Sequence, residues 1–128
     1  EKVYNRALFV IQENKRTIES ANKISQSKFK EFGKLMYKSH HGLKELYEVS
    51  CEELDFLVEF SCSYNEVIGS RMMGGGFGGC TINLIEENFV DDFIKTVSSA
   101  YLTKFNVRLN AFQTNIDNGV TVKKILKF

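Results

Sequence analysis

The spacing of apolar residues predicts two helices in the first third of the chain. Residues 3–24 carry apolar side chains at intervals of three and four, which is the period of an amphipathic helix. The stripe expected to face the core is Tyr4, Ala7, Leu8, Ile11, Ile18 and Ala21. A second helix is predicted over residues 28–39, and its inward side chains are Phe29, Phe32, Leu35 and Met36.

A third helix is predicted to begin at Ser50. Ser50 and Glu53 have the spacing of a capping box, in which each side chain accepts a hydrogen bond from the other residue's free backbone amide. Leu54, Leu57 and Val58 follow with helical spacing, so we expect them to face the core.

The hydrophobic period changes in the second half, where short stretches bounded by glycine replace the long helical ones. Residues 67–73 and 80–86 contain β-branched residues and predict two strands, joined by a run of glycines. Two more strands, residues 108–116 and 120–128, flank the sequence Asp-Asn-Gly at 117–119, which is a hairpin turn signal.

Between the two strand pairs, residues 89–105 predict a fourth helix. Asn88 is its expected N-cap, and Asp91 and Asp92 lie in its first turn, where the helix dipole favours negative charge. The whole order predicts a single α+β domain over residues 1–128, with an antiparallel sheet and helices on one face.

Composition excludes several classes of function. The chain has 128 residues and a net charge of +1, so no electrostatic case exists for binding nucleic acid or an anionic membrane. Three cysteines are too few for a disulfide framework and lack the C-x-x-C spacing of a metal site, which favours a cytoplasmic setting. We expect Cys51 and Cys62 to face the core and Cys80 to be buried at the start of a strand.

The glycine run is the main candidate for function. It comprises Gly74, Gly75, Gly76, Phe77, Gly78 and Gly79. Its G-x-G-x-x-G spacing matches a dinucleotide fingerprint, but that motif needs a helix after it, and here a strand is predicted. Two interpretations remain near even from the residues alone: a tight hairpin, or a loop whose backbone N–H groups approach a phosphate. Phe77 slightly favours the second, because a plain hairpin needs no aromatic tip.

Two stretches resemble conserved motifs of the galactokinases, within the GHMP small-molecule kinases. The glycine run looks like the third conserved motif, and the matching residues are Arg71, Met72, Gly74, Gly76, Phe77, Gly78, Gly79 and Cys80. Residues 39–58 resemble a second pattern, with matches at Ser39, His40, Leu43, Tyr47, Glu48, Val49, Ser50, Cys51, Glu53, Leu54 and Asp55. Met73 departs from the family, which usually has threonine there, so any role of that hydroxyl is lost.

The resemblance implies the ferredoxin-like C-terminal domain of a GHMP kinase with extra N-terminal helices. The family's reaction transfers the γ-phosphate of ATP to the C1 hydroxyl of galactose, with Mg²⁺. Its sugar signature, main phosphate loop and catalytic aspartate belong to an N-terminal domain whose patterns do not occur in this sequence. The resemblance therefore implies no catalytic residue and no metal ligand here, an inactive isolated chain, and galactose and ATP reached through the missing domain. Self-association through the exposed interdomain face is a further expectation.

Other interpretations stay open beside this one. The chain could be a domain of another GHMP kinase acting on a different sugar or small molecule, or a non-enzymatic α+β binding module. Arg71 precedes the glycine run and could contact an anion, although a structural ion pair or solvent exposure is favoured. His40 and His41 are adjacent on a helix and point in different directions, so packing or capping is expected rather than a shared metal.

Overall fold

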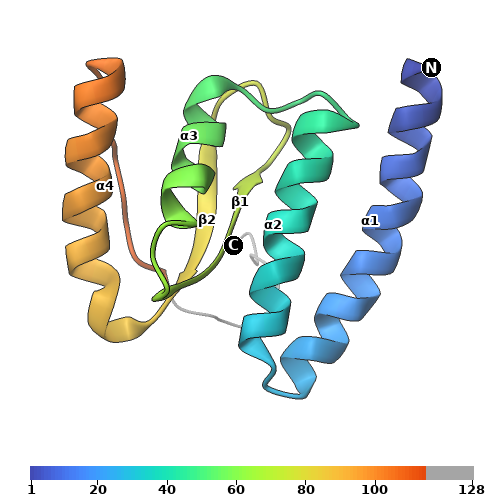
Figure 1. Ribbon diagram of the computed structural model, residues 1–128, viewed down its shortest axis with the longest axis horizontal. Coiled ribbons are helices and arrows are strands. Elements are labelled where there is room, and N and C mark those ends of the chain that lie inside the picture. The colour runs from blue at the N-terminus through green and yellow to red at the C-terminus, as the bar shows by residue number, and fades with distance from the viewer. Residues whose placement is uncertain (115–128) are drawn as a thin grey trace, which may run out of the picture.

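The computed structural model describes residues 1–114, whose elements follow the predicted order (Figure 1). The elements are α1 (Lys2–Ser25), α2 (Phe29–Glu45), α3 (Glu52–Ser61), β1 (Val67–Met73), β2 (Cys80–Ile85), the 3-10 turn η1 (Glu87–Phe89) and α4 (Val90–Phe105). The four predicted helices and the first two predicted strands are confirmed. The main difference in length is in α2, which continues past the predicted end at residue 39.

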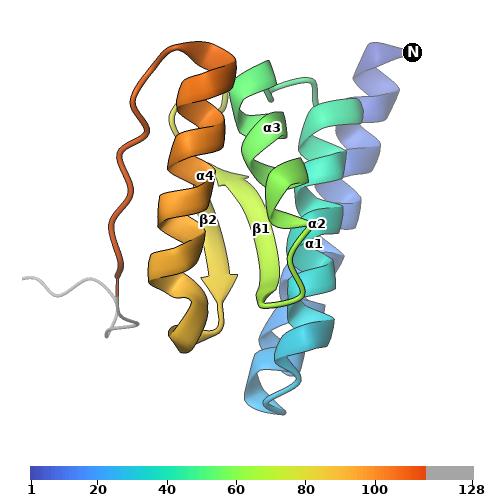
Figure 2. The same cartoon turned by 60° about the vertical axis from the view of Figure 1, so that its left-hand side comes forward.

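β1 and β2 form a two-stranded antiparallel sheet, which confirms the α+β class. Met73 pairs with Cys80, so residues 74–79 close the hairpin directly. The first strand predicted near the C-terminus is wrong over residues 108–114, which form no strand. Leu109 packs against the core instead, in a segment that runs back beside α4 (Figure 2). The rest of that predicted hairpin, residues 115–128, lies outside the described residues.

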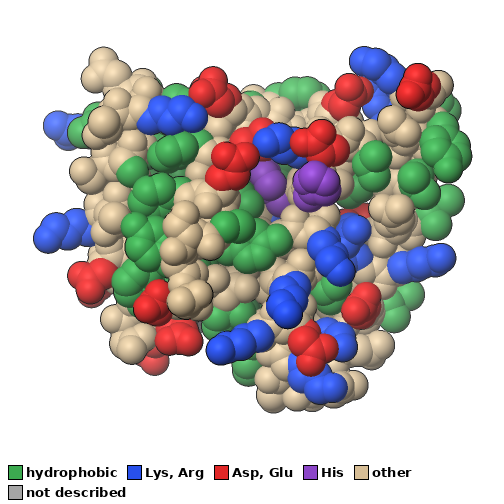
Figure 3. All heavy atoms as spheres, viewed as in Figure 1, with side chains coloured by type: hydrophobic (Ala, Val, Ile, Leu, Met, Phe, Trp, Pro, Cys, Tyr) green, Lys and Arg blue, Asp and Glu red, His purple; other side chains and the backbone are tan. Residues whose placement is uncertain are grey.

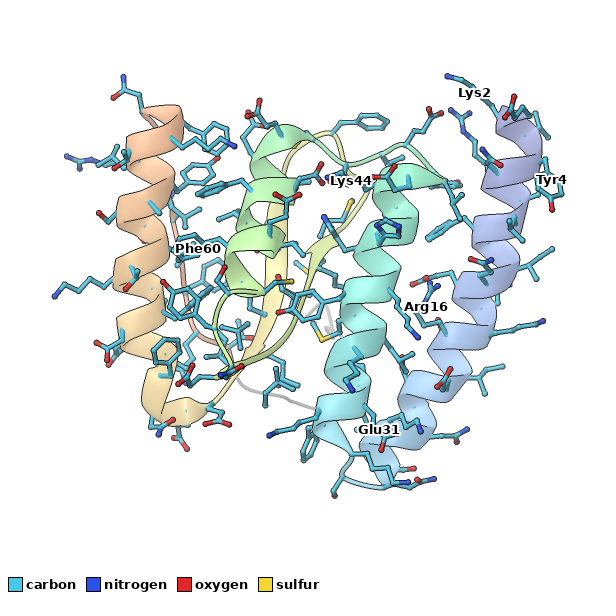
Figure 4. The ribbon with its side chains drawn as sticks, viewed as in Figure 1. Lys2, Tyr4, Arg16, Glu31, Lys44 and Phe60 are labelled. Atoms are coloured by element: carbon cyan, nitrogen blue, oxygen red, sulfur yellow. The ribbon has the colours of Figure 1, made fainter. Side chains whose placement is uncertain are left out.

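A hydrophobic core joins α3 and α4 to the sheet. Leu57 of α3, Val67 of β1, and Phe93 and Val97 of α4 are buried together. Partly buried side chains surround them: Phe56, Phe60, Tyr64, Ile85, Phe89, Tyr101 and Leu109. Phe60 points from α3 toward α4 in Figure 4. Such aromatic clusters bury large apolar areas, so this core fixes both helices against the hairpin.

α2 covers one edge of β1 at unusually close range. A Cβ added to Gly33 of α2 would lie 1.8 Å from the Ile68 carbonyl oxygen, so only glycine permits this approach. Along the same edge, the Tyr37 hydroxyl lies 3.5 Å from the Val67 carbonyl oxygen, and the Met72 N–H donates to His40 Nδ1 at 3.2 Å. The helix thus supplies partners for strand groups that no neighbouring strand pairs.

α1 packs on α2 with the face opposite to the one predicted. Tyr4, Ile11 and Ile18 were expected in the core, but they are 67%, 55% and 67% exposed. Figure 4 shows Tyr4 pointing away from α2 and Arg16 lying between the two helices. Phe9 is the only buried residue of α1. A polar cluster described below occupies much of the inner face, which explains why a search for apolar spacing selected the wrong side.

Both predicted N-caps are also wrong. The Ser50 hydroxyl donates to Asp55 at 2.6 Å, and Cys51 holds the N-cap position of α3 without a side-chain hydrogen bond. Asn88 lies inside η1, which places Phe89 at the N-cap of α4. The acidic first turn of α4, with Asp91 and Asp92, is confirmed.

Candidate functional site

The glycine loop, residues 74–79, has a backbone that most residues do not adopt. Gly74, Gly76, Gly78 and Gly79 have φ values of 85°, 84°, 132° and 93°. Phe77 also has a positive φ of 60°, which is uncommon for a non-glycine residue. Four glycines are therefore explained by backbone conformation, since other L-residues are strained there.

One contact anchors the loop to the segment between α2 and α3. The Phe77 N–H donates to the Val49 carbonyl oxygen at 2.8 Å. A Cβ added to Gly76 would lie 2.1 Å from that same oxygen, so the two backbones touch. Around Gly74, Gly75 and Gly78, in contrast, an added Cβ would meet nothing within 4 Å. The loop is held at Gly76 and Phe77, and most of its remaining backbone faces open space.

Phe77 lies at the rim of a small hollow of about 180 Å³. The other lining residues are Arg6, Tyr47, Glu48 and Val49. Glu48 pairs with Lys2 and Arg6 of α1, each at 3.5 Å. Phe77 itself is 77% exposed. A plain turn requires neither an aromatic side chain nor a positive φ at a non-glycine residue, and contact between Phe77 and a ligand or another domain stays a prediction.

Arg71 lies three residues before the loop and is bound by other side chains. Its Nη1 donates to Ser39 Oγ at 2.9 Å and lies 3.5 Å from Glu13 Oε1. Glu13 also accepts from Ser39 at 2.5 Å and pairs with Arg16. This cluster connects α1, α2 and β1. Contact between Arg71, whose side chain is 36% exposed, and an anion stays a prediction.

His40 is buried between β1 and α3, as the packing interpretation expected. It is 5% exposed. Because Nδ1 accepts the Met72 N–H, the neutral ring carries its proton on Nε2. Nε2 lies 3.2 Å from Asp55 Oδ1, but the two groups are not aligned as in a regular hydrogen bond. Burial lowers the pKa of His40, and the nearby Asp55 charge opposes that shift only in part. His41 is exposed and lines a groove of about 370 Å³ between α1 and α2.

Asp55 contacts three side chains, those of Ser50, Lys44 and His40. Ser50 Oγ lies 2.6 Å from Oδ1, the same oxygen that faces His40, and Lys44 Nζ lies 3.1 Å from Oδ2. Burial alone would raise the pKa of Asp55, but the hydrogen bonds from Ser50 and Lys44 hold it below its ordinary value. Figure 3 shows charged side chains gathered beside the two histidines. Asp55 and Val49 both lie in the second galactokinase-like stretch, but the spacing of residues predicted no role for either.

The cysteines do not form a site. Cys62 and Cys80 are exposed and Cys51 is partly exposed, so the prediction that they are buried is wrong for the first two. Over the described part of the chain, no group of three or more His, Cys, Asp or Glu side chains is placed to hold a metal ion. No helix within residues 1–114 is long and apolar enough to cross a bilayer.

Comparison with known proteins gives consistent matches. The family described as GHMP kinases C terminal matches residues 18–101. A galactokinase of Bacillus subtilis is 44% identical over 114 residues, which are 89% of this chain and 29% of that protein. A galactokinase of Clostridium acetobutylicum is 41% identical over 120 residues, which are 94% of this chain and 30% of that protein.

A solved structure agrees with these matches. The crystal structure of Lactococcus lactis galactokinase complexed with galactose has a TM-score of 0.81 and 36% identity to this chain. The match covers 84% of this chain and 28% of that one. The chain thus spans less than a third of the length of these relatives. Since the family match covers most of the sequence, the chain belongs to the GHMP kinases, as a C-terminal domain whose relatives are galactokinases.

Proposed function

We propose that the chain acts as the C-terminal domain of a galactokinase, which transfers the γ-phosphate of ATP to the C1 hydroxyl of galactose. The observation that carries the proposal is the open backbone of the glycine loop. It lies in a chain 44% identical to a galactokinase, and an added Cβ at Gly74, Gly75 or Gly78 would meet nothing within 4 Å. Backbone N–H groups without neighbouring side chains can approach phosphate oxygens closely.

The role of this domain is positioning. Phosphoryl transfer depends mainly on alignment and on neutralising charge, and Mg²⁺ bound with ATP supplies much of that neutralisation. The loop fits phosphate oxygens rather than a metal ion, because it offers backbone donors and no carboxylate. We place the catalytic base, the Mg²⁺ site and most nucleotide contacts in the domain that galactokinases carry before this one. The isolated chain is then expected to be inactive, and residues 74–79 line one wall of the cleft.

Gly75 gives the sharpest test of the loop's role. It is the one loop glycine without a positive φ, and a Cβ there meets nothing within 4 Å, so a side chain leaves this domain's fold intact. In the full-length protein we expect Gly75→Leu to reduce ADP formation from ATP, Mg²⁺ and galactose by more than about tenfold. The melting temperature of the variant should be unchanged. Exposed Ile18 supplies the control, because Ile18→Leu changes an apolar surface far from the loop in sequence.

Unchanged turnover in Gly75→Leu would reduce the loop to a structural hairpin. Full-length protein that phosphorylates a different acceptor but not galactose would assign another GHMP kinase activity. Activity of residues 1–128 alone would contradict the division of labour, because a base and a nucleotide site would then lie within this chain.

Self-association through the interdomain face stays a prediction, and we propose that the outer face of α1 is a surface through which the isolated chain self-associates. This face consists of exposed apolar side chains: Val3, Tyr4, Val10, Ile11, Ile18 and Ile24. Figure 3 shows apolar side chains on the outer side of α1, at the right of the view. A second copy would remove these side chains from water. Sedimentation of the chain over a range of concentrations tests this, and a monomer throughout would refute it.

A further inference from the structure

The anchor of the glycine loop is itself fixed on both sides. Val49 provides the carbonyl that accepts the Phe77 N–H. The Val49 N–H donates to the Leu43 carbonyl oxygen at 3.0 Å, which joins it to the last turns of α2. On the other side, the Ser50 hydroxyl donates to Asp55 Oδ1 at 2.6 Å, which joins it to the first turn of α3. The position of the loop therefore depends on how α2 and α3 hold residues 49 and 50.

A buried pair connects this anchor to the strand that leads into the loop. Asp55 holds Ser50, and its Oδ1 lies 3.2 Å from Nε2 of His40. The other ring nitrogen of His40 accepts the N–H of Met72, two residues before the loop. Lys44, labelled near the ends of α2 and α3 in Figure 4, bonds the second oxygen of Asp55. One histidine and one carboxylate thus contact the strand residue two positions before the loop and the residue that follows its anchor.

We propose that His40 and Asp55 are positioning residues, which set where the backbone N–H groups of residues 74–79 lie relative to the transferred phosphate. The inference rests on the proposed function, because it assumes that the loop lines the cleft. Both side chains are shielded from solvent: His40 is buried and the Asp55 side chain is 18% exposed. They act through Met72, Ser50 and the Val49 carbonyl rather than by touching substrate.

The loop needs such support because little else restrains it. Glycine has the greatest conformational freedom of any residue, and three loop glycines have no neighbour within reach of a Cβ. Misplacing a group by about 1 Å can cost around 100-fold in rate. Loss of the Ser50 bond should allow smaller shifts, so we expect kcat to fall about tenfold while KM for ATP and for galactose stays within about twofold.

The test uses the full-length protein, three substitutions and one matched control. Ser50→Ala removes the bond to Asp55, and Ser50→Thr keeps a hydroxyl and should restore kcat. His40→Asn keeps an acceptor for the Met72 N–H and loses the group that faces Asp55. The matched control is Glu59→Gln, since Glu59 also pairs with Lys44 but is 70% exposed and contacts neither Ser50 nor His40.

Hydrogen exchange of residues 74–79, followed by mass spectrometry, measures the loop without relying on activity. We expect faster exchange in Ser50→Ala and His40→Asn, and wild-type exchange in Glu59→Gln, with α4 unchanged throughout. Unchanged loop exchange and unchanged kcat in Ser50→Ala would overturn the proposal. Faster exchange in α4 together with the loop would also overturn it, because the substitution would then have loosened the whole domain. If the wild-type protein does not phosphorylate galactose but the loop still loosens in Ser50→Ala, the proposed function fails and the positioning role stands.

Discussion

The close approach of α2 to β1 predicts that Gly33→Ala destabilises the domain, although alanine is the better helix former. In a helix interior, glycine to alanine is worth about 1 kcal/mol of added stability. Here the new Cβ would lie 1.8 Å from the Ile68 carbonyl oxygen and 2.5 Å from the carbonyl carbon. Backbone atoms of a paired strand cannot swing aside as a side-chain tip can, so helix and strand must separate.

The size of the effect follows from what that separation breaks. Overpacking of this kind costs about 1–3 kcal/mol. Moving α2 away also lengthens the bond from the Met72 N–H to His40, and an unsatisfied buried N–H costs about 1–3 kcal/mol. After subtracting the gain in helix propensity, we expect a net loss of about 1–5 kcal/mol, with a central value of about 3 kcal/mol. For a domain of this size that corresponds to a melting temperature lower by roughly 10 °C.

Gly42→Ala is the matched control, because it makes the same change in the same helix. Its Cβ would meet the ring of Phe9 at 2.7 Å, and a side chain can tilt away. We expect Gly42→Ala to stay within about 1 kcal/mol of wild type, since the propensity gain offsets the crowding. Urea unfolding followed by circular dichroism measures both variants. A Gly33→Ala variant as stable as Gly42→Ala, or more stable than wild type, would refute the close helix–strand contact.

Three further predictions concern other parts of the fold. Ser70 is fully buried and its hydroxyl donates to Asn83 at 2.6 Å. Ser70→Ala should therefore lower the free energy of unfolding in urea by about 1–2 kcal/mol, and a decrease below about 0.5 kcal/mol would contradict a stabilising role for this bond. The pKa of His40 is lower in the folded chain than in the unfolded chain, so the unfolded chain binds more protons below about pH 6.5. The free energy of unfolding should therefore decline as pH falls below about 6.5, and it should decline less steeply in His40→Asn. Equal pH slopes in the two proteins would refute this. Ile18→Lys should leave stability within about 0.5 kcal/mol and weaken self-association in sedimentation, whereas strong destabilisation would show that Ile18 is buried.

The sequence predicted elements better than it predicted their orientation. The period of three and four in residues 3–24 correctly indicates a helix, because periodicity depends on the backbone geometry. It selects Tyr4, Ile11 and Ile18 as the buried face, yet these are exposed. The face that packs on α2 carries Glu13 and Arg16, which pair with each other, and Glu13 also contacts Ser39 and Arg71 from two other elements. A single-sequence pattern contains no information about such distant partners.

The same limit applies to the candidate site. Five clustered glycines were enough to identify the loop, because glycine is the residue that tolerates positive φ. Its anchor could not be found this way, since the Val49 carbonyl is a backbone group that any residue would offer. Ser50 was assigned to a capping box by its spacing, but its hydroxyl binds Asp55, five residues away. Local rules of capping therefore placed the right residue at the right helix end and gave it the wrong partner.

Two structural reasons explain most of the glycines within residues 1–114: a close contact between two backbones, and a backbone conformation with positive φ. Gly33 and Gly69 are glycines because α2 and β1 touch there, and Gly76 because the loop touches Val49. Gly74 and Gly78 have open surroundings, but their positive φ explains them. Gly75 has neither reason: its φ is not positive, and nothing lies within 4 Å of an added Cβ. Within residues 1–114 no contact requires glycine at position 75, so a loss of turnover in Gly75→Leu at unchanged stability would report on the proposed role of the loop and not on its fold.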